Sequence, residues 1–218
     1  MKNKRTSLVM STTNTLNSSV TSLITEAIST ASTYTEYREQ MRNLVANNKS
    51  TGVLHTDALA NYTMLNDKRM KRLDKTTKLP DATISKIKQV TAKTTWLVLT
   101  ESWCGDAAQS MPVMQKFAEQ NSKIDVKVIL RDENLELMNH FLYNNTLSIP
   151  RLIAFNEDTQ EVIGDWGPRP SKLTKIVENF KAKNGSLTPE FKQELQVWYN
   201  KDKGNTIIED LTQLLALK

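Results

Sequence analysis

Apolar residues recur at helical spacing through a Ser- and Thr-rich segment near the start of the chain. Between residues 16 and 45 they lie three or four positions apart and would line one face of a helix. This pattern predicts one long amphipathic helix that ends between Asn47 and Gly52. A second helix is expected from about Asp57 to Leu73, and a short third helix through Ile84, Ile87 and Val90.

From about residue 94 the pattern changes to short apolar strands that alternate with amphipathic helices. Four strands are expected, at residues 95–100, 124–130, 151–155 and 160–163. Helices are expected at residues 104–119, 132–143, 170–183, from 188 onwards and at about 206–217. This order indicates an α/β fold with a mixed central sheet and helices on both faces.

Composition narrows the class of protein. The 218 residues carry a net charge of +5, which is too mild to indicate nucleic acid as a partner. The single cysteine excludes an intramolecular disulfide. The start, Met1 to Arg5, is basic but no apolar stretch of a signal peptide follows it, and no run approaches the ~20 apolar residues of a membrane span. A cytoplasmic protein without a membrane partner is therefore expected.

The segment from Glu101 to Ala107 carries the strongest chemical signal. It follows a buried strand and opens a helix, which places the Cys104 thiol beside unpaired backbone amides at a helix N-terminus. Such a position favours the thiolate, which is the nucleophile in disulfide exchange. Asp106 in the first helical turn opposes this effect, because its negative charge disfavours a nearby thiolate.

A second candidate segment is Ser148-Ile149-Pro150-Arg151, directly before a strand. Proline suits the first residue of a strand, and the bond before proline is the one place where a cis peptide is accessible at low cost. Such a loop would present backbone to a neighbouring site. Arg151 is a candidate for approaching Cys104 or a bound anion.

Together these residues resemble the thioredoxin family. Trp103-Cys104-Gly105 matches the start of the Trp-Cys-Gly-Pro-Cys active site, and Ile149-Pro150 falls where the family carries a cis-proline. A closer likeness is to a bacterial thioredoxin-like branch with a Trp-Cys-Gly-Asp active site and a helical N-terminal extension. That branch is also similar to this chain at residues 65–75, 131–134 and 166–170.

The resemblance implies a thioredoxin-like fold with an N-terminal helical extension. We expect a flexible tail over residues 1–13 and a helical extension over 14–92 that packs on or next to the sheet. The thioredoxin-like domain would cover residues 93–218 and carry additional C-terminal helices. Trp166 and Arg169, in the turn before the last helix of the fold, are expected near the surface that carries Pro150.

The departures from the family pattern predict the chemistry. Ala107 occupies the position of the resolving cysteine, so an external thiol would have to complete the reaction. Asp106 replaces the family's proline, and Val98 stands where the family places a buried acid. The resemblance therefore implies a monothiol, with Cys104 as the nucleophile. The residues that would flank it in the active site are Trp103, Gly105, Asp106 and Ala107. The Ile149-Pro150 loop would bind the substrate.

Protein or low-molecular-weight thiols and disulfides are the expected partners, and three functions stay open. The first is thiol–disulfide exchange. The second is a redox-inactive binding or chaperone-like module, whose N-terminal helices pack on the sheet or form a homodimer. The third is a peroxide sensor that passes through a sulfenic acid to an intermolecular disulfide. The two histidines, His55 and His140, lie far apart and no glycine-rich phosphate loop occurs, so neither a metal nor a cofactor is expected.

Overall fold

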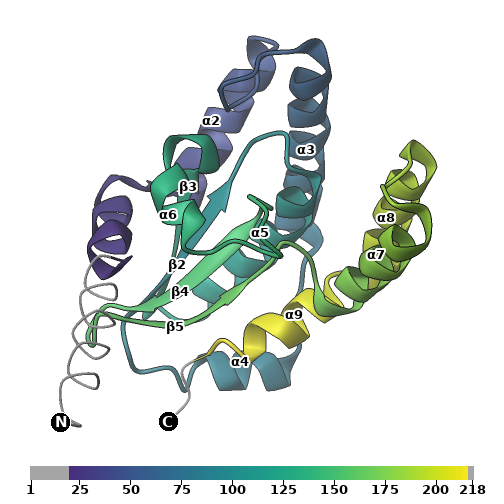
Figure 1. Ribbon diagram of the computed structural model, residues 1–218. Coiled ribbons are helices and arrows are strands. Elements are labelled where there is room, and N and C mark those ends of the chain that lie inside the picture. The colour runs from purple at the N-terminus through teal and green to yellow at the C-terminus, as the bar shows by residue number, and fades with distance from the viewer. Residues whose placement is uncertain (1–19, 216–218) are drawn as a thin grey trace, which may run out of the picture.

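A computed structural model describes residues 20–215 and builds them around a five-stranded mixed sheet (Figure 1). The strands are β1 (Ser32–Thr33), β2 (Thr94–Thr100), β3 (Ile124–Leu130), β4 (Arg151–Asn156) and β5 (Glu161–Trp166). Their order in the sheet is β1-β3-β2-β4-β5; β2 and β3 are parallel, and the other three pairs are antiparallel. The α/β class with a mixed sheet is confirmed.

The helices include one at residues 20–30 and nine more in chain order. These are α2 (Tyr34–Ala46), α3 (Asp57–Thr76), α4 (Asp81–Ile87), α5 (Gly105–Ala118), the 3-10 helix η1 (Arg131–Glu133), α6 (Leu135–Asn139), α7 (Ser171–Asn184), α8 (Pro189–Asp202) and α9 (Asn205–Thr212). Among the described helices, none is both long and apolar enough to cross a membrane.

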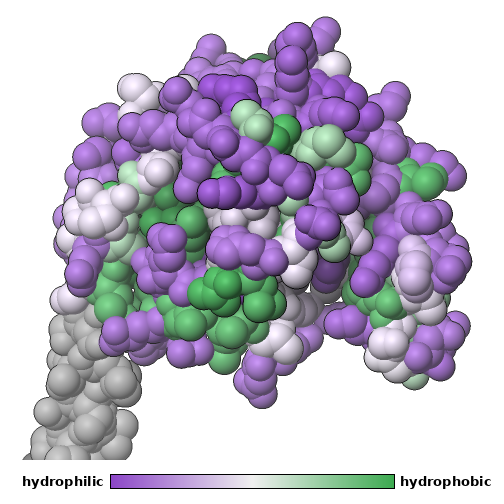
Figure 2. All heavy atoms as spheres, turned by 90° about the horizontal axis from the view of Figure 1, so that it is seen from above, coloured by the Kyte–Doolittle hydropathy of each residue, from purple (hydrophilic) through white to green (hydrophobic). Residues whose placement is uncertain are grey.

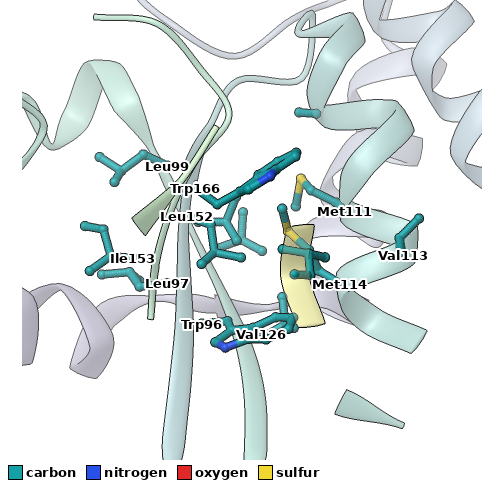
Figure 3. Close-up of a cluster of buried hydrophobic side chains, with 14 of the residues drawn as sticks. Trp96, Leu97, Leu99, Met111, Val113, Met114, Val126, Leu152, Ile153 and Trp166 are labelled. Carbon is teal, nitrogen blue, oxygen red and sulfur yellow. The ribbon is translucent and has the colours of Figure 1, made fainter. Parts of the chain in front are cut away.

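Strand β2 lies at the centre of the sheet, and every one of its residues is buried. Its continuous apolar run follows from this position, since both faces of the strand are covered. Figure 3 shows Leu97 and Leu99 on one face, whereas Trp96 points to the other, towards the helix α5 that carries Met111 and Met114. On this face the ring centroids of Trp96 and Phe117 lie 5.3 Å apart.

The long N-terminal helix predicted from residues 16–45 is wrong as a continuous element. Ser32 and Thr33 instead form β1, which pairs with the edge of β3. Thr33 then caps α2: its side chain accepts a hydrogen bond from the Glu36 N–H, and the Glu36 carboxylate accepts one from the Thr33 N–H. A capping box of this kind starts a new helix, so it overrides the helical spacing of the apolar residues. The tail predicted over residues 1–13 lies outside the described residues.

The apolar side of this N-terminal segment packs into the core of the same chain. Ile24, Tyr37 and Met41 are buried there. Arg38 of α2 is also buried, and it binds Asp67 at 2.9 Å and Asp74 at 3.3 Å on α3. The apolar helix face that suggested a homodimer is thus covered by the rest of the same chain. The homodimer itself stays a prediction.

The helix predicted at 132–143 is replaced by two short pieces, η1 and α6. Asn134 separates them, because its backbone is not helical and its side-chain amide donates to the Leu130 carbonyl at 2.8 Å. At the C-terminal end, α9 packs beside β5, where Asp210 accepts hydrogen bonds from the Trp166 indole and the Ser171 N–H. These contacts anchor the chain on both sides of the turn at residues 167–170.

Candidate functional site

Cys104 is the N-cap of α5, immediately after the turn that leaves β2. Its Sγ accepts a hydrogen bond from the Ala107 N–H at 3.4 Å and donates one to the Ile149 carbonyl at 3.3 Å. Only 7% of the residue is exposed. The two segments singled out in the sequence therefore meet at one sulfur atom, which is held as a thiol that donates to a backbone oxygen.

A cavity of about 340 Å³ lies beside this sulfur. Two loops and the start of α5 form its wall; the lining residues are Trp103, Cys104, Gly105, Asp106, Arg131, Leu147, Ser148, Ile149, Pro168 and Arg169. Arg131 lies over the Trp103 ring at 5.2 Å from its centre and donates to the Leu147 carbonyl at 3.2 Å. This arginine thereby joins the aromatic wall to the loop that precedes Ile149.

Asp106 projects from the first turn of α5 and is fully partnered. Its Oδ2 lies 2.7 Å from Nη2 of Arg169, and its Oδ1 accepts a hydrogen bond from the Tyr199 hydroxyl at 2.9 Å. The Asp106 side chain is 12% exposed. Burial raises the pKa of Asp106, while Arg169 and Tyr199 oppose that rise. Two helices that lie far apart in sequence, α5 and α8, are linked through this carboxylate.

Electrostatics keep the Cys104 sulfur protonated. Burial is the largest cause and the charge of Asp106 the next, and together they raise the pKa of Cys104 to about 12. The backbone N–H groups of Ala107 and Asp106, and the Arg169 guanidinium, lower it by less. The helix N-terminus, which by itself favours the thiolate, therefore does not outweigh burial and Asp106 here.

Residues 51–66, which precede the sheet in the chain, hold the turn that carries Trp103 and Cys104. The Ser102 hydroxyl lies 2.9 Å from the Thr51 N–H, which donates to it, and 2.8 Å from the Thr63 hydroxyl. The Ser102 N–H donates to the Thr51 hydroxyl at 2.8 Å, and the Ser102 carbonyl accepts from the Asn66 amide at 2.9 Å. These contacts make residues 51–66 part of the support of the site.

The predicted site residues do not all reach the cavity. Trp103, Cys104, Gly105, Asp106, Ile149 and Arg169 line it, and Ala107 lies just beneath with its N–H on the sulfur. Arg151 is buried away from the cavity, where it donates to the Gly167 carbonyl and pairs with Asp165. Trp166 is buried against Asp210. Arg151 and Trp166 therefore support the loops around the cavity and do not line it.

The loop at Pro150 packs tightly against the turn after β5. The Ile149–Pro150 and Gly167–Pro168 peptide bonds are both cis. Gly167 has φ +119, and a Cβ at this position would meet the Pro150 carbonyl oxygen at 2.1 Å. Only glycine is compatible with this close approach.

Sequence reasoning gave no site role to Tyr199, Arg131, Thr51 or Asn66, although the resemblance to the family branch included residues 65–75 and 131–134. Tyr199 lies 93 positions from Asp106, and a lone tyrosine on an amphipathic helix gives no sign of such a partner. Within residues 20–215, no three His, Cys, Asp or Glu side chains gather in a way that would hold a metal ion.

Comparison with known proteins places these features in context. A family model described as thioredoxin matches residues 52–181. A crystal structure of a protein of unknown function from Pseudomonas aeruginosa is 15% identical, covers 87% of this chain and 95% of its own, and gives a TM-score of 0.60. A crystal structure of an HIV epitope-scaffold, also 15% identical with the same coverage, gives 0.55. No curated protein sequence matches the chain. At this identity the two structures are similar in fold alone.

Proposed function

The chain belongs to the thioredoxin family, and from this premise we propose that it carries out thiol–disulfide exchange as a monothiol through Cys104. The observation that carries the proposal is the position of the sulfur. It accepts the Ala107 N–H at the start of α5 and borders a cavity with Trp103 and Ile149 in its wall. Ala107 cannot resolve a mixed disulfide, so an external thiol is the partner that completes the cycle.

The exchange has two steps. The Cys104 thiol loses its proton to solvent, and the thiolate attacks one sulfur of a disulfide; a Cys104 mixed disulfide forms and the other half leaves as a thiolate. An external thiolate then attacks the partner's sulfur in that mixed disulfide. Cys104 leaves as a thiolate and takes up a proton again. The sum exchanges one thiol for another, with no net oxidation of the protein.

The raised pKa of Cys104 sets the pace of both steps. A shift from 9.0 to about 12 lowers the fraction of thiolate at neutral pH about a thousandfold. Each thiolate is in turn about 30-fold more nucleophilic, because nucleophilicity rises with pKa. Attack is then about 30-fold slower than by an unperturbed thiol. A thiol of high pKa is also a poor leaving group, so the mixed disulfide is long-lived. The site suits the holding of a partner more than rapid turnover.

Within the family, Trp103-Cys104-Gly105-Asp106 followed by Ala107 supports a place in the bacterial branch that lacks the resolving cysteine. Exchange with an external thiol also fits the cytoplasm, where small thiols keep cysteines reduced. Both assignments belong to the proposal.

A second candidate is a redox-inactive binding module. The hydrogen bond from the Cys104 thiol to the Ile149 carbonyl favours it, because this contact uses the protonated form. In that function the cavity binds a ligand without covalent chemistry, and Cys104 packs as a small apolar residue.

Alkylation of Cys104 by iodoacetamide separates the two functions. Monothiol exchange predicts modification of the native protein, at least about 30-fold slower than in the unfolded chain at neutral pH because the thiol is both protonated and buried, and faster as the pH rises. The rate should not change with low concentrations of urea, because the folded state itself reacts. Modification that occurs only through unfolding, with a rate that rises steeply with urea, would rule out the exchange and leave the binding module.

A further inference from the structure

A second cavity, of about 260 Å³, lies between α3 and α8. It is lined by Lys68, Arg69 and Arg72 of α3, by Gln196 and Asn200 of α8, and by Gln109 of α5, together with one leucine. The wall thus holds three cations and three amides but no carboxylate. Figure 1 shows α8 alongside α7, and the hydrogen bond from Arg72 to Asn200 joins α8 to α3, 128 positions earlier in the chain.

The cations of this cavity have no acidic partner. Within residues 20–215, no carboxylate forms an ion pair with Lys68, Arg69 or Arg72. Arg69 donates to the Asn66 amide oxygen at 2.6 Å, and Arg72 donates to that of Asn200 at 3.0 Å. These neutral acceptors fix the guanidinium groups without compensating their charge.

The two arginines also repel each other. Burial lowers the pKa of Arg69, and the like charge of Arg72 lowers it further. Asp106 attracts Arg69 weakly from beyond the cavity, but its carboxylate is already bound to Arg169. An anion in the cavity would relieve this repulsion, and guanidinium groups are suited to bidentate contacts with carboxylate or phosphate.

Gly105 lies next to both this cavity and the sulfur site. A Cβ on Gly105 would lie 3.8 Å from Nη1 of Arg69 and 3.8 Å from Nε2 of Gln196. Gly105 also lines the cavity of Cys104, its neighbour in the chain. A small molecule that lies across Gly105 would place one end at Cys104 and the other at the arginines.

We propose that the cavity between α3 and α8 binds the carboxylate or phosphate groups of a small anionic thiol whose sulfur reaches Cys104. The sulfur part of this inference rests on the proposed exchange at Cys104; the binding of the anion does not. Figure 2 shows a mostly hydrophilic face from above, with apolar groups in its lower part. The polar character of the cavity itself comes from the three cations and three amides that line it.

Binding is tested first without any sulfur chemistry. The probes are S-methylglutathione, which carries carboxylates, and S-methyl-coenzyme A, which carries phosphates; both are titrated calorimetrically into the Cys104→Ser chain at low salt. Arg72→Ala should lower the affinity for the probe about tenfold or more, because a charged hydrogen bond to the anion is lost. Arg69→Ala should act in the same direction.

The matched control is Lys71→Ala, which removes the same charge from the neighbouring position of α3; both positions are exposed, but only Arg72 lines the cavity. It should change the affinity by less than about twofold. Whichever probe binds identifies carboxylate or phosphate as the anion. Binding of neither probe, or an equal loss in the Arg72 and Lys71 variants, would overturn the proposal.

Kinetics with the native cysteine separate this inference from the proposed function. Oxidised glutathione and the neutral hydroxyethyl disulfide are compared by the rate of mixed-disulfide formation on Cys104. Arg72→Ala should slow the reaction with oxidised glutathione, or with coenzyme A disulfide if the phosphate probe bound, and leave the neutral disulfide unchanged. If the wild type and Arg72→Ala reacted with the anionic disulfide at the same rate, the anion site would be refuted and the exchange at Cys104 would stand. Binding of a probe without reaction of any disulfide would refute the exchange and leave the anion site.

Discussion

The two cavities on either side of Gly105 differ in how their charges are compensated. At the sulfur site, Asp106 is bound by Arg169 and Tyr199, and the Cys104 thiol donates to a backbone carbonyl. At the α3–α8 cavity, Arg69 and Arg72 meet only amide oxygens. The fold thus compensates the charges beside the sulfur internally, whereas no carboxylate of residues 20–215 pairs with the cations that line the α3–α8 cavity. The proposed anion would pair with these cations.

The restraint has two sources of different size. Burial contributes most to the raised pKa of Cys104, and Asp106 contributes next. Variants that alter one source at a time can therefore break or sharpen the contrast between the two cavities.

The largest expected effect is on stability at high pH. The pKa of Cys104 is about 12 in the folded protein against 9.0 for an ordinary thiol, so the folded state retains a proton that the unfolded state loses. The stabilisation is fully present below pH 9 and is lost as the pH rises towards 12, by about 1.4 kcal/mol per pH unit. Urea denaturation from pH 8 to 11 should show this loss in the wild type relative to Cys104→Ser, in which other titrating groups are unchanged. Parallel curves would contradict a buried, protonated thiol.

Arg169→Gln breaks the compensation at the sulfur site. It leaves the Asp106 carboxylate without its cation, and we expect the free energy of unfolding to fall by about 2 kcal/mol, because both side chains are largely buried. The pKa of Cys104 should rise further. Lys172→Gln, which breaks the exposed pair with Glu209, is the control and should cost less than about 1 kcal/mol. Equal losses in the two variants would show that the Arg169–Asp106 pair behaves as a surface pair.

Asp106→Asn should make Cys104 more reactive. The substitution removes the negative charge that raises the pKa of the thiol and frees the positive charge of Arg169. A fall of about one pKa unit would accelerate alkylation at neutral pH about threefold, because the gain in thiolate fraction is partly offset by lower nucleophilicity. The control is Glu119→Gln, at the opposite end of the same helix, which should leave the rate unchanged. No acceleration would mean that burial alone protects the thiol.

Tyr199→Phe has the smallest expected effect. It removes one hydrogen bond to Asp106, of 2.9 Å, and should lower the free energy of unfolding by about 1 kcal/mol. Tyr62→Phe, at an exposed position of α3, should be silent in the same thermal denaturation experiment. A silent Tyr199→Phe would indicate that Arg169 alone satisfies the carboxylate.

The sheet and the location of the sulfur were predictable from sequence because their signals are local. A fully apolar run such as β2 reports burial on both faces, and Trp103-Cys104-Gly105 directly after it marks the start of α5. Strand β1 was not predictable in the same way, since Ser32 and Thr33 lie within helical apolar spacing. The capping box of Thr33 and Glu36 was the available signal for the break.

The electrostatics of the site were less predictable because they depend on contacts between distant segments. The sequence showed that Asp106 opposes a thiolate, but the degree of burial of Cys104 and the partner Tyr199 arise only when α8 packs near α5. The sequence shows that α3 carries several cationic residues, but not what faces them. Their concentration in a cavity next to Gly105 depends on the placement of α3 against α5 and α8.

The most direct test of monothiol exchange is intact-protein mass spectrometry of the native chain incubated with oxidised glutathione at neutral pH. Our account predicts a single glutathione adduct on Cys104 that forms slowly, persists after the disulfide is removed, and is released by an added thiol. An adduct that forms in the unfolded chain but never in the folded one would contradict it, and Cys104 would then be a buried structural residue.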